Sequence, residues 1–506
     1  MQIHQGQPIL TTAQMRSAEQ SVIDKKIVSS DELMELAGQA VACASNKTKL
    51  DAGRVVIVVG CGNNGGDGFV AARLLRKRQV PVTVIPLFPL RTLKGDNANQ
   101  AALAAKAGAK IRPATSSSDL NDLNAWLGRA VLIVDAIFGT GLKKTISGWL
   151  AQAINCINQA NRPILAIDIA SGLDGDNGSV LGTAIHADAT LPIAAYKWGH
   201  WLNQGSEHSG CLLQPAPIGI NLEALHHTLK NDPQPSSQSL LIDKTMIEKA
   251  FPKPAAHAHK QTFGHLWVFG GSVGFTGAPK LAAMGAQAVG IGLVSIVCPK
   301  DVYEIIASSS LETMVHPQGN TPSSTANAIV AGPGWGKKQA DKLIELFSAS
   351  CPIVLDADAL NMLAEHSNVQ TSFLQRRNLS VLTPHPGEAG RLLGISANLI
   401  QQDRLGSALA LAKKYHAWVV LKGAQTIIVS PDRHIWINPF GSFHLAVAGT
   451  GDILAGMVGA LLAAGEAPEI AIPAAVGLHG LSGEQKSWHR AGQLPDIIAA
   501  QRKSFM

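Results

Sequence analysis

The chain has 506 residues, which is longer than one ordinary hydrophobic core supports, so two or three domains are expected. Its hydrophobic share of 46% and its 49 glycines favour an α/β protein rich in strand-to-helix turns and exclude a disordered chain. The net charge of +6 is spread over both halves and only 5% of the residues are aromatic, which argues against a nucleic-acid-binding surface. The mild positive excess suits small molecules that carry phosphate.

The six cysteines form no C-x-x-C pair and no zinc-ligand spacing, which is typical of free thiols in a reducing cytoplasm. The longest uncharged run, residues 281–299, is long enough to suggest a membrane helix. Glycine, glutamine and serine interrupt it, and its β-branched end predicts a strand after a small-residue helix. We therefore expect a cytoplasmic protein that does not enter the membrane, and we expect it to form a homo-oligomer.

The first half alternates between strand and helix patterns. Residues 12–46 predict two helices, the second capped by Ser30. The strands predicted after them are residues 54–60, 80–87, 131–135 and 163–169, and the helices between these strands are residues 67–78, 97–107 and 148–160. This rhythm predicts a Rossmann-like, doubly wound parallel sheet.

The alternation stops in a polar stretch rich in proline and serine, residues 226–242, which reads as a linker. Residues 1–225 and 243–506 are thus expected to be separate α/β domains. The strands predicted in the second are residues 265–270, 293–297, 327–331, 352–356, 380–383 and 417–421, and two closing helices are predicted near 452–464 and 467–485.

A glycine-rich loop follows the first predicted strand and opens a helix. It reads Gly60-Cys61-Gly62-Asn63-Asn64-Gly65-Gly66-Asp67-Gly68, the context of a phosphate-binding G-x-G-x-x-G turn. An ordinary dinucleotide co-substrate site also needs an acidic residue about 20 positions later, and residues 86–89 contain none. We expect the loop to hold a ligand through backbone N–H groups without forming a standard dehydrogenase site; the alternative is a tight turn only.

Polar side chains follow three of the predicted strands of the first half. They are Asn64, then Asp135, then Asp168 with Ser171. Because ligands of parallel sheets bind at the carboxyl ends of strands, these groups can converge. Hard oxygen donors without histidine or cysteine suit an alkali or alkaline-earth cation better than zinc. The alternative, that each acid only caps the next helix, is stronger for Asp174 than for Asp135.

In the second half, Val447-Ala448-Gly449-Thr450-Gly451-Asp452 precedes a long apolar run and predicts a helix start. The N–H groups of Thr450 and Gly451 can hold negative charge there, while Asp452 can accept a hydroxyl proton. The alternative is that Asp452 is only a helix-capping acid. No Walker A lysine is present, so nucleotide phosphates must be held by backbone loops, helix ends and a cation.

Gly270-Gly271-Ser272-Val273-Gly274 matches the G-x-S-x-G pattern of a serine nucleophile. The loop continues as Phe275-Thr276-Gly277, which is too long and too rich in glycine for a strained turn. We therefore interpret the match as accidental.

The motifs of the first half resemble a known family. The glycine-rich loop, Val134-Asp135-Ala136-Ile137-Phe138-Gly139-Thr140-Gly141-Leu142 and residues 168–174 are long and specific, and with them residues 10–220 resemble the NAD(P)H-hydrate epimerases. The resemblance implies that Asn64, Asp135 and Ser171 bind a potassium ion, and Asp135 is expected to handle protons at the hydrated carbon. The residues implied for contact with the hydrated nicotinamide nucleotide are Asn63, Asn64, Gly65, Gly66, Asp67, Gly139, Thr140, Gly141, Leu142, Lys143, Lys144, Thr145 and Asp168.

Residues 245–490 resemble the ADP/ATP-dependent NAD(P)H-hydrate dehydratases, which have a ribokinase-like fold. The matching stretches are Gly270-Gly271-Ser272, Gly332-Pro333-Gly334, Asp356-Ala357-Asp358, Thr383-Pro384-His385-Pro386-Gly387-Glu388, Lys422-Gly423 and Ala448 to Asp452. The resemblance implies Mg²⁺ and ADP, with the adenine nucleotide bound by Lys422, Gly423, Ala424, Gln425, Thr426 and Gly451. It implies that Ala278, Gly334, His385 and Asp452 face the hydrate.

Both resemblances together imply a bifunctional enzyme that repairs hydrated nicotinamide nucleotides. The first domain would interconvert the R and S hydrates of NADH and NADPH, and the second would dehydrate the S form at the expense of ADP, giving AMP and phosphate. Two alternatives stay open. One is a ribokinase-like kinase of a stable small alcohol, and the other is a non-catalytic binding module.

Overall fold

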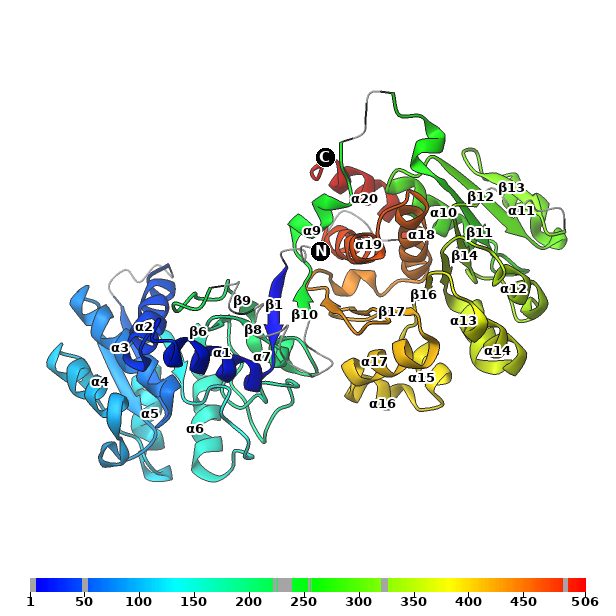
Figure 1. The fold of residues 1–506 in the computed structure, drawn as a ribbon. Helices are drawn as coiled ribbons and strands as arrows, with labels where there is room; N and C mark the ends of the chain where they lie inside the picture. The colour runs from blue at the N-terminus through cyan, green and yellow to red at the C-terminus, as the bar shows by residue number, and fades with distance from the viewer. Residues whose placement is uncertain are drawn as a thin grey trace. The chain divides into compact units, whose positions relative to one another are not determined.

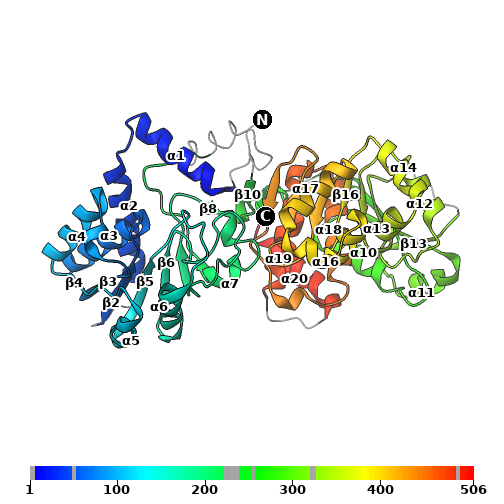
Figure 2. The same ribbon diagram turned by 90° about the horizontal axis from the view of Figure 1, so that it is seen from below.

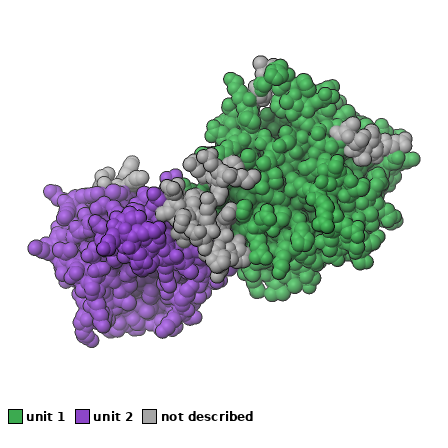
Figure 3. All heavy atoms as spheres, in the orientation of Figure 1, with its two compact units in different colours: residues 1–7, 238–506 green, residues 8–237 purple. Residues whose placement is uncertain are grey.

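The computed structural model describes residues 6–47, 53–221, 225, 239–253, 255, 257–319, 326–485 and 490–506. The chain divides into two compact units, residues 8–237 and residues 238–506 with 1–7 (Figure 3). The division falls inside the stretch expected to be a linker, of which residues 226–238 lie outside the described part. The end of that stretch forms a strand, β10 (Ser239–Leu241).

The unit of residues 8–237 contains one parallel sheet in the order β4-β3-β2-β5-β6-β7-β9. Its strands are β2 (Arg54–Val59), β3 (Val82–Pro86), β4 (Lys110–Ile111), β5 (Ala130–Ala136), β6 (Ile164–Ile167), β7 (Ala189–Leu191) and β9 (Cys211–Leu212), and a separate parallel pair joins β1 (Gln7–Leu10) to β8 (Tyr196–Lys197). Its helices are α1 (Thr12–Asp24), α2 (Ser30–Lys47), α3 (Asn63–Lys77), α4 (Gly95–Lys106), α5 (Leu120–Leu127), α6 (Gly148–Gln159) and α7 (Gly205–Ser209).

Helices cover both faces of this sheet because the central strands are apolar on both sides (Figures 1 and 2). Along β2, Val55 and Ile57 pack with α2, α3 and α4, whereas Val56 and Val58 pack with α5 and α6. The strand order reverses between β2 and β5. The doubly wound sheet predicted from the alternating pattern is confirmed, and a crevice is expected at this reversal.

The unit of residues 238–506 contains a larger sheet in the order β13-β12-β11-β14-β15-β16-β17-β18-β19-β10. Its strands after β10 are β11 (His265–Phe269), β12 (Leu293–Cys298), β13 (Met314–Pro317), β14 (Ala328–Ala331), β15 (Ile353–Leu355), β16 (Ser380–Leu382), β17 (Trp418–Leu421), β18 (Ile427–Val429) and β19 (Ile435–Ile437). Its helices are α9 (Lys244–Lys249), α10 (Ala278–Ala288), α11 (Tyr303–Ala307), α12 (Ala340–Leu346), α13 (Ala357–Glu365), α14 (Ser367–Gln375), α15 (Pro386–Leu393), α16 (Ala397–Gln402), α17 (Arg404–Tyr415), α18 (Thr450–Ala463), α19 (Pro468–Gly483) and α20 (Leu494–Lys503).

The pairs from β13 through β17 are parallel, and β18 is antiparallel to both of its neighbours. One face packs against α10, α18 and α19 in a continuous apolar core, and α15, α16 and α17 lie on the other side of the strands (Figure 1). The second α/β domain is therefore confirmed. Its antiparallel strands β18 and β19 were not predicted.

Several boundaries differ from the prediction. Helix α3 begins at Asn63, four residues before the predicted start, so the loop residues after Gly62 belong to its first turn. Ser30 does not cap α2, because the preceding Ser29 does: its Oγ accepts the N–H of Glu32 at 3.3 Å, and its own N–H donates to the Glu32 carboxylate at 2.8 Å.

The uncharged run of residues 281–299 forms the end of α10 followed by β12. Among the described residues, no helix is both long and apolar enough to cross a membrane. All six cysteines are free thiols.

Candidate active sites

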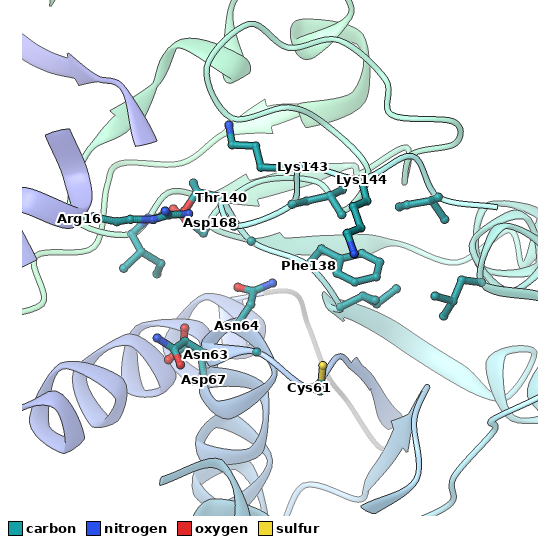
Figure 4. A pocket seen from close by; sticks show the side chains of 18 of the residues that line it. Arg16, Cys61, Asn63, Asn64, Asp67, Phe138, Thr140, Lys143, Lys144 and Asp168 are labelled. Atoms are coloured by element: carbon teal, nitrogen blue, oxygen red, sulfur yellow. The ribbon is translucent and has the colours of Figure 1, made fainter. Parts of the chain in front are cut away.

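The first unit has a cavity of about 860 Å³ at the carboxyl ends of β2, β5 and β6, where the strand order reverses. Figure 4 shows Lys143, Lys144 and Phe138 on one wall and Asn63, Asn64 and Asp67 on the wall that α3 forms. The predicted contact residues that line it are Asn63, Asn64, Asp67, Gly139, Thr140, Gly141, Leu142, Lys143, Lys144, Thr145 and Asp168. Gly65 and Gly66 are buried in α3 and do not line it.

The glycine-rich loop brings α3 close to the sheet. A Cβ on Gly65 would lie 1.9 Å from the carbonyl oxygen of Gly60, and one on Gly60 would lie 1.8 Å from the carbonyl oxygen of Ile137. No side chain caps α3 at Gly62, and the N–H groups of Gly65 and Gly66 donate to the Gly62 carbonyl, so the N–H groups of Asn63 and Asn64 are the ones available to an anion in the cavity. The loop is therefore more than a tight turn.

Asp135 and Ser171 lie behind the cavity wall and are both fully buried. The Asp135 carboxylate accepts hydrogen bonds from the Ser171 hydroxyl at 2.6 Å, the Ser171 N–H at 2.8 Å and the Ile137 N–H at 3.2 Å. Burial raises the pKa of Asp135 to about 6, although the Ser171 hydrogen bonds lower it. Asp135 does not line the cavity, so direct proton transfer to a ligand there, as expected from the sequence, is not what this geometry favours.

The three residues expected to bind potassium come from α3, the end of β5 and the turn after β6. Asn64 lies beside Gly139, and its amide nitrogen is buried without a hydrogen-bond partner among the described residues. The Asp135 carboxylate has no cationic partner in the same part of the chain. A desolvated carboxylate next to hydroxyl and amide oxygens fits a hard monovalent cation.

Asp168 is held at the cavity edge by a buried cation that sequence reasoning missed. Lys197, whose side chain is fully buried, forms an ion pair with the Asp168 carboxylate and donates a hydrogen bond to the Ile193 carbonyl at 2.7 Å. The same carboxylate oxygen accepts the Ile193 N–H at 3.0 Å. A lysine inside the apolar stretch of residues 193–198 was the available signal.

Helix α1 contributes two cavity residues that no motif indicated, Arg16 and Glu19. With Lys143 and Lys144, Arg16 gives the cavity a cationic side. Lys143 is held at the rim by Asp176 at 3.1 Å and Asp174 at 3.6 Å. Lys144 has no ion pair within the described residues and can reach a ligand phosphate.

The second unit has a cavity of about 710 Å³, which is lined by the loops after β17 and β19 and by the start of α18. The residues predicted to bind nucleotide all line it: Lys422, Gly423, Ala424, Gln425, Thr426 and Gly451. His385 lines it as well. The residues of this wall that sequence reasoning missed include Asn438, Phe440, Phe443, Leu445, Val476 and His479.

Gly449 caps α18 in the left-handed conformation, with φ of 98°, and a Cβ there would lie 2.4 Å from Leu281. The Thr450 hydroxyl donates to the Leu445 carbonyl at 2.8 Å. Asp452 therefore lies in the first turn of α18 and is not its cap. Because the Thr450 carbonyl accepts from His479 Nε2 at 3.0 Å, the neutral His479, whose pKa burial lowers to about 4, fixes this turn.

One lysine lies close to several carboxylates beside α18. Lys422 Nζ lies 2.7 Å from Asp356 and 3.9 Å from Glu388. Burial raises the pKa of Asp452 to about 7, as does the nearby Asp356, while Lys422 lowers it. Burial and Asp356 likewise raise the pKa of Glu388. Because the negative charge exceeds the positive charge here, the carboxylates fit a divalent cation such as Mg²⁺.

His385 both caps a helix and lines the cavity. Its Nδ1 accepts the N–H groups of Gly387 at 2.9 Å and Glu388 at 3.4 Å, which caps α15, while the ring lines the cavity. Burial, Lys422 and Arg391 lower the pKa of His385. The ring is thus a neutral Nε2–H donor at neutral pH.

Of the residues expected to face the hydrate, Asp452, Gly334 and Ala278 do not line this cavity, and the last two lie together. A Cβ on Gly334 would lie 3.1 Å from that of Ala278 and 2.7 Å from the Phe275 carbonyl oxygen. The Ser272 hydroxyl donates to the Gly334 carbonyl at 2.8 Å. Ser272 therefore holds a loop and shows no arrangement of a serine nucleophile, as predicted.

Arg404 holds the loop that follows β17, residues 422–426, through its carbonyl groups. Its guanidinium donates hydrogen bonds to the carbonyls of Ala424, Leu421 at 3.3 Å and Lys422 at 3.5 Å. It also lies 2.9 Å from where a Cβ on Gly423 would be, and Gly423 has a φ of 146°. Arg404 thereby fixes three loop carbonyls.

Replacing Arg404 with lysine should raise the KM for the nucleotide about tenfold, because an ammonium group cannot span three carbonyls and about 1.4 kcal/mol of binding is lost. Steady-state kinetics at a saturating concentration of the second substrate measures this, and the kcat should change less than the KM. Arg377→Lys, at an exposed position outside the cavity, is the matched control. An unchanged KM would contradict the role of Arg404.

Two separate cavities, each at the carboxyl edge of a parallel sheet and each supplied with anion-binding groups, define a two-site nucleotide-binding α/β enzyme. Residues 30–199 match the family described as YjeF-related protein N-terminus, and residues 266–501 match NAD(P)H-hydrate dehydratase.

A bifunctional NAD(P)H-hydrate repair enzyme of Moorella thermoacetica is 35% identical over 97% of this chain and 96% of its own length. The one from Escherichia coli is 32% identical over 93% and 88%. The chain belongs to the family of bifunctional NAD(P)H-hydrate repair enzymes, so the enzyme class expected from the sequence is confirmed. The ADP/ATP-dependent NAD(P)H-hydrate dehydratase of Bacillus subtilis, co-crystallised with ATP and Mg²⁺, is 32% identical and covers 53% of this chain and 98% of its own, with a TM-score of 0.48.

Proposed function

We propose that the first unit interconverts the R and S forms of hydrated NADH and NADPH, and that the second dehydrates the S form with ADP. The observation that supports this division is the pair of cavities. The first offers free N–H groups of α3 and three cationic side chains to a dinucleotide. The second combines the loop of residues 422–426 with the start of α18. Beside them lies the carboxyl group of Asp452, whose pKa is raised by burial.

Asp452 does not line the second cavity but is partly exposed beside it, next to Gly451. It would accept the proton of the C6 hydroxyl as that oxygen attacks the terminal phosphoryl group of ADP. The N–H groups of Thr450 and Gly451 would hold the developing charge, and AMP would leave. The phosphorylated oxygen then departs from C6 with the electrons of its C–O bond, assisted by the ring nitrogen. Loss of a proton from C5 restores the double bond of NAD(P)H.

Two metal ions fit these sites. Asn64, Asp135 and Ser171 would hold potassium, which would neutralise the buried carboxylate and fix the turn at Ser171 against the cavity wall. Asp356 and Glu388 would hold Mg²⁺, which would supply positive charge to the transferring phosphoryl group.

Incubation of the purified chain with hydrated NADH and ADP tests the proposal. Recovery of absorbance in the reduced-nicotinamide band, with one AMP and one phosphate formed for each NADH, is expected. A kinase that phosphorylates a stable hydroxyl of the nucleotide would form AMP without absorbance recovery. A kinase of an alcohol absent from the assay, or a binding module, would form neither product. Either result would overturn the proposal.

The dehydration should lose kcat/KM as pH falls through about 7, because burial raises the pKa of Asp452 to that value and only the ionised form above it can accept a proton. A pH profile with S-hydrate and ADP measures this. Conversion of R to S in the same preparation is the control for intact protein. A profile that stays flat well below neutrality would show that Asp452 is not the base.

A further inference from the structure

Two carboxyl groups at the edge of the first sheet, those of Asp135 and Asp168, are already fully engaged. Asp135 accepts three hydrogen bonds and is fully buried behind the wall. Asp168 is paired with the buried Lys197 and also accepts the N–H of Ile193. Neither carboxylate is free to exchange a proton with a ligand without breaking these contacts.

Two further carboxyl groups, those of Asp67 on α3 and Glu19 on α1, both line the cavity. Within the described residues, neither accepts a hydrogen bond or forms an ion pair. Asn64 lines the same cavity, and its amide nitrogen is buried with no partner in that part of the chain. These unpartnered polar groups point to a ligand that lies against α1 and α3 (Figure 4).

The charges that face the two carboxyls differ. Burial, then Asp168 and Glu19, raises the pKa of Asp67 well above its usual value. Burial and Asp168 also raise the pKa of Glu19, but Lys197 and Arg16 lower it. Because two neighbouring carboxylates rarely ionise together, Asp67 keeps its proton in the range where Glu19 has lost its own. One cavity thus holds an acid and a base.

Inversion at C6 of the hydrate requires such a pair. C6 bears a hydroxyl group next to the ring nitrogen. When the C6–N bond opens, a base takes the hydroxyl proton as the aldehyde forms, and an acid gives a proton to the nitrogen that receives the bond electrons. Rotation about the C5–C6 bond and closure on the opposite face return both protons. Loss and return of water at C6 would need the same two groups.

We propose that Glu19 and Asp67 are the catalytic base and acid of the epimerisation, with Lys197 and Asp168 as positioning residues. This assignment rests on the proposed epimerase activity of the first cavity. It adds α1, which precedes the matched residues 30–199, to the catalytic machinery. It leaves Asp135 to the cation site.

The experiment starts from purified R-hydrate and measures S-hydrate by chromatography for the full chain and for Glu19→Gln and Asp67→Asn. Each variant should lower kcat by about 10²- to 10⁴-fold with the KM changed by less than about threefold. In the pH profile of kcat/KM, Glu19→Gln should remove the acidic limb and Asp67→Asn the alkaline limb. Asp67→Glu should recover part of the rate.

Asp24→Asn is the matched control, because Asp24 ends α1 outside the cavity and accepts a hydrogen bond from Gln20 at 2.7 Å. Thermal unfolding of each variant shows whether the first unit is intact, and dehydration of purified S-hydrate should stay at the level of the parent chain.

The outcomes are distinguishable. Variants that keep the parent rate, or lose kcat while both limbs of the pH profile remain, would overturn the assignment of Glu19 and Asp67 and leave the epimerase activity standing. A parent chain that does not convert R-hydrate, while it dehydrates S-hydrate, would overturn the proposed function of the first cavity and the assignment with it.

Discussion

Asp452→Asn should lower the rate of S-hydrate dehydration by about 10²- to 10⁴-fold and leave R-to-S conversion unchanged. Asparagine has nearly the same shape but cannot accept the hydroxyl proton. The loss should fall on kcat, because the first turn of α18 keeps its N–H groups for the nucleotide. Release of phosphate from S-hydrate and ADP measures the change.

Asp341→Asn is the matched control for this variant. Asp341 also lies in the first turn of a helix, α12, but it is exposed and no residue of that helix lines the cavity. A variant Asp452→Asn that keeps more than about a tenth of the parent rate would show that the proton leaves by another route.

Lys422→Met should abolish dehydration and also destabilise the second unit. Lys422 holds the buried Asp356 at 2.7 Å and lies 3.2 Å from where a Cβ on Gly451 would be, so its charge serves both the carboxylates and the phosphate site. Removing one partner of a buried ion pair costs about 3–5 kcal/mol. Urea unfolding measures the stability, and the dehydration assay measures the activity.

The double variant Lys422→Met with Asp356→Asn separates the two effects. It removes the unpaired buried charge, while the asparagine still accepts the Thr383 hydroxyl that now lies 2.8 Å from Asp356. Stability should return and activity should not. Recovered activity would contradict a role for Lys422 in phosphate transfer, and Lys413→Met on the exposed side of α17 is the control.

Much of both cavities could be predicted because parallel strands place the residues that follow them at one edge. That rule, with the glycine-rich loop, brings Asn64, residues 139–145 and Asp168 together. In the second unit it does the same for His385, residues 422–426 and Gly451. The position of a motif that directly follows a parallel strand can therefore be predicted from the sequence.

The direction of each side chain could not be predicted in the same way. Asp135 lies at the end of β5 and Asp67 lies in α3, which follows β2, yet the first is turned behind the wall and the second lines the cavity. Arg404 and Lys197 were missed because each acts on a loop about twenty or more residues away through contacts that no short motif contains.

Short strands were missed for a different reason. Strands β18 and β19 have three residues each, and a run such as Ile427–Val429 has no periodicity that distinguishes a strand from part of a helix. Their pairing with β17 depends on contacts across the sheet. The missed α5 is short as well, with eight residues.

The division into two units, each with its own core, also determines which activity a destabilising substitution affects. A core substitution acts first on the packing of the unit that contains it. The consequences for the coenzyme pool would still be unequal. If the first activity is lost, S-hydrate is still cleared and only R-hydrate accumulates. If the second activity is lost, both hydrates accumulate. Selection on the larger unit should therefore be the more severe.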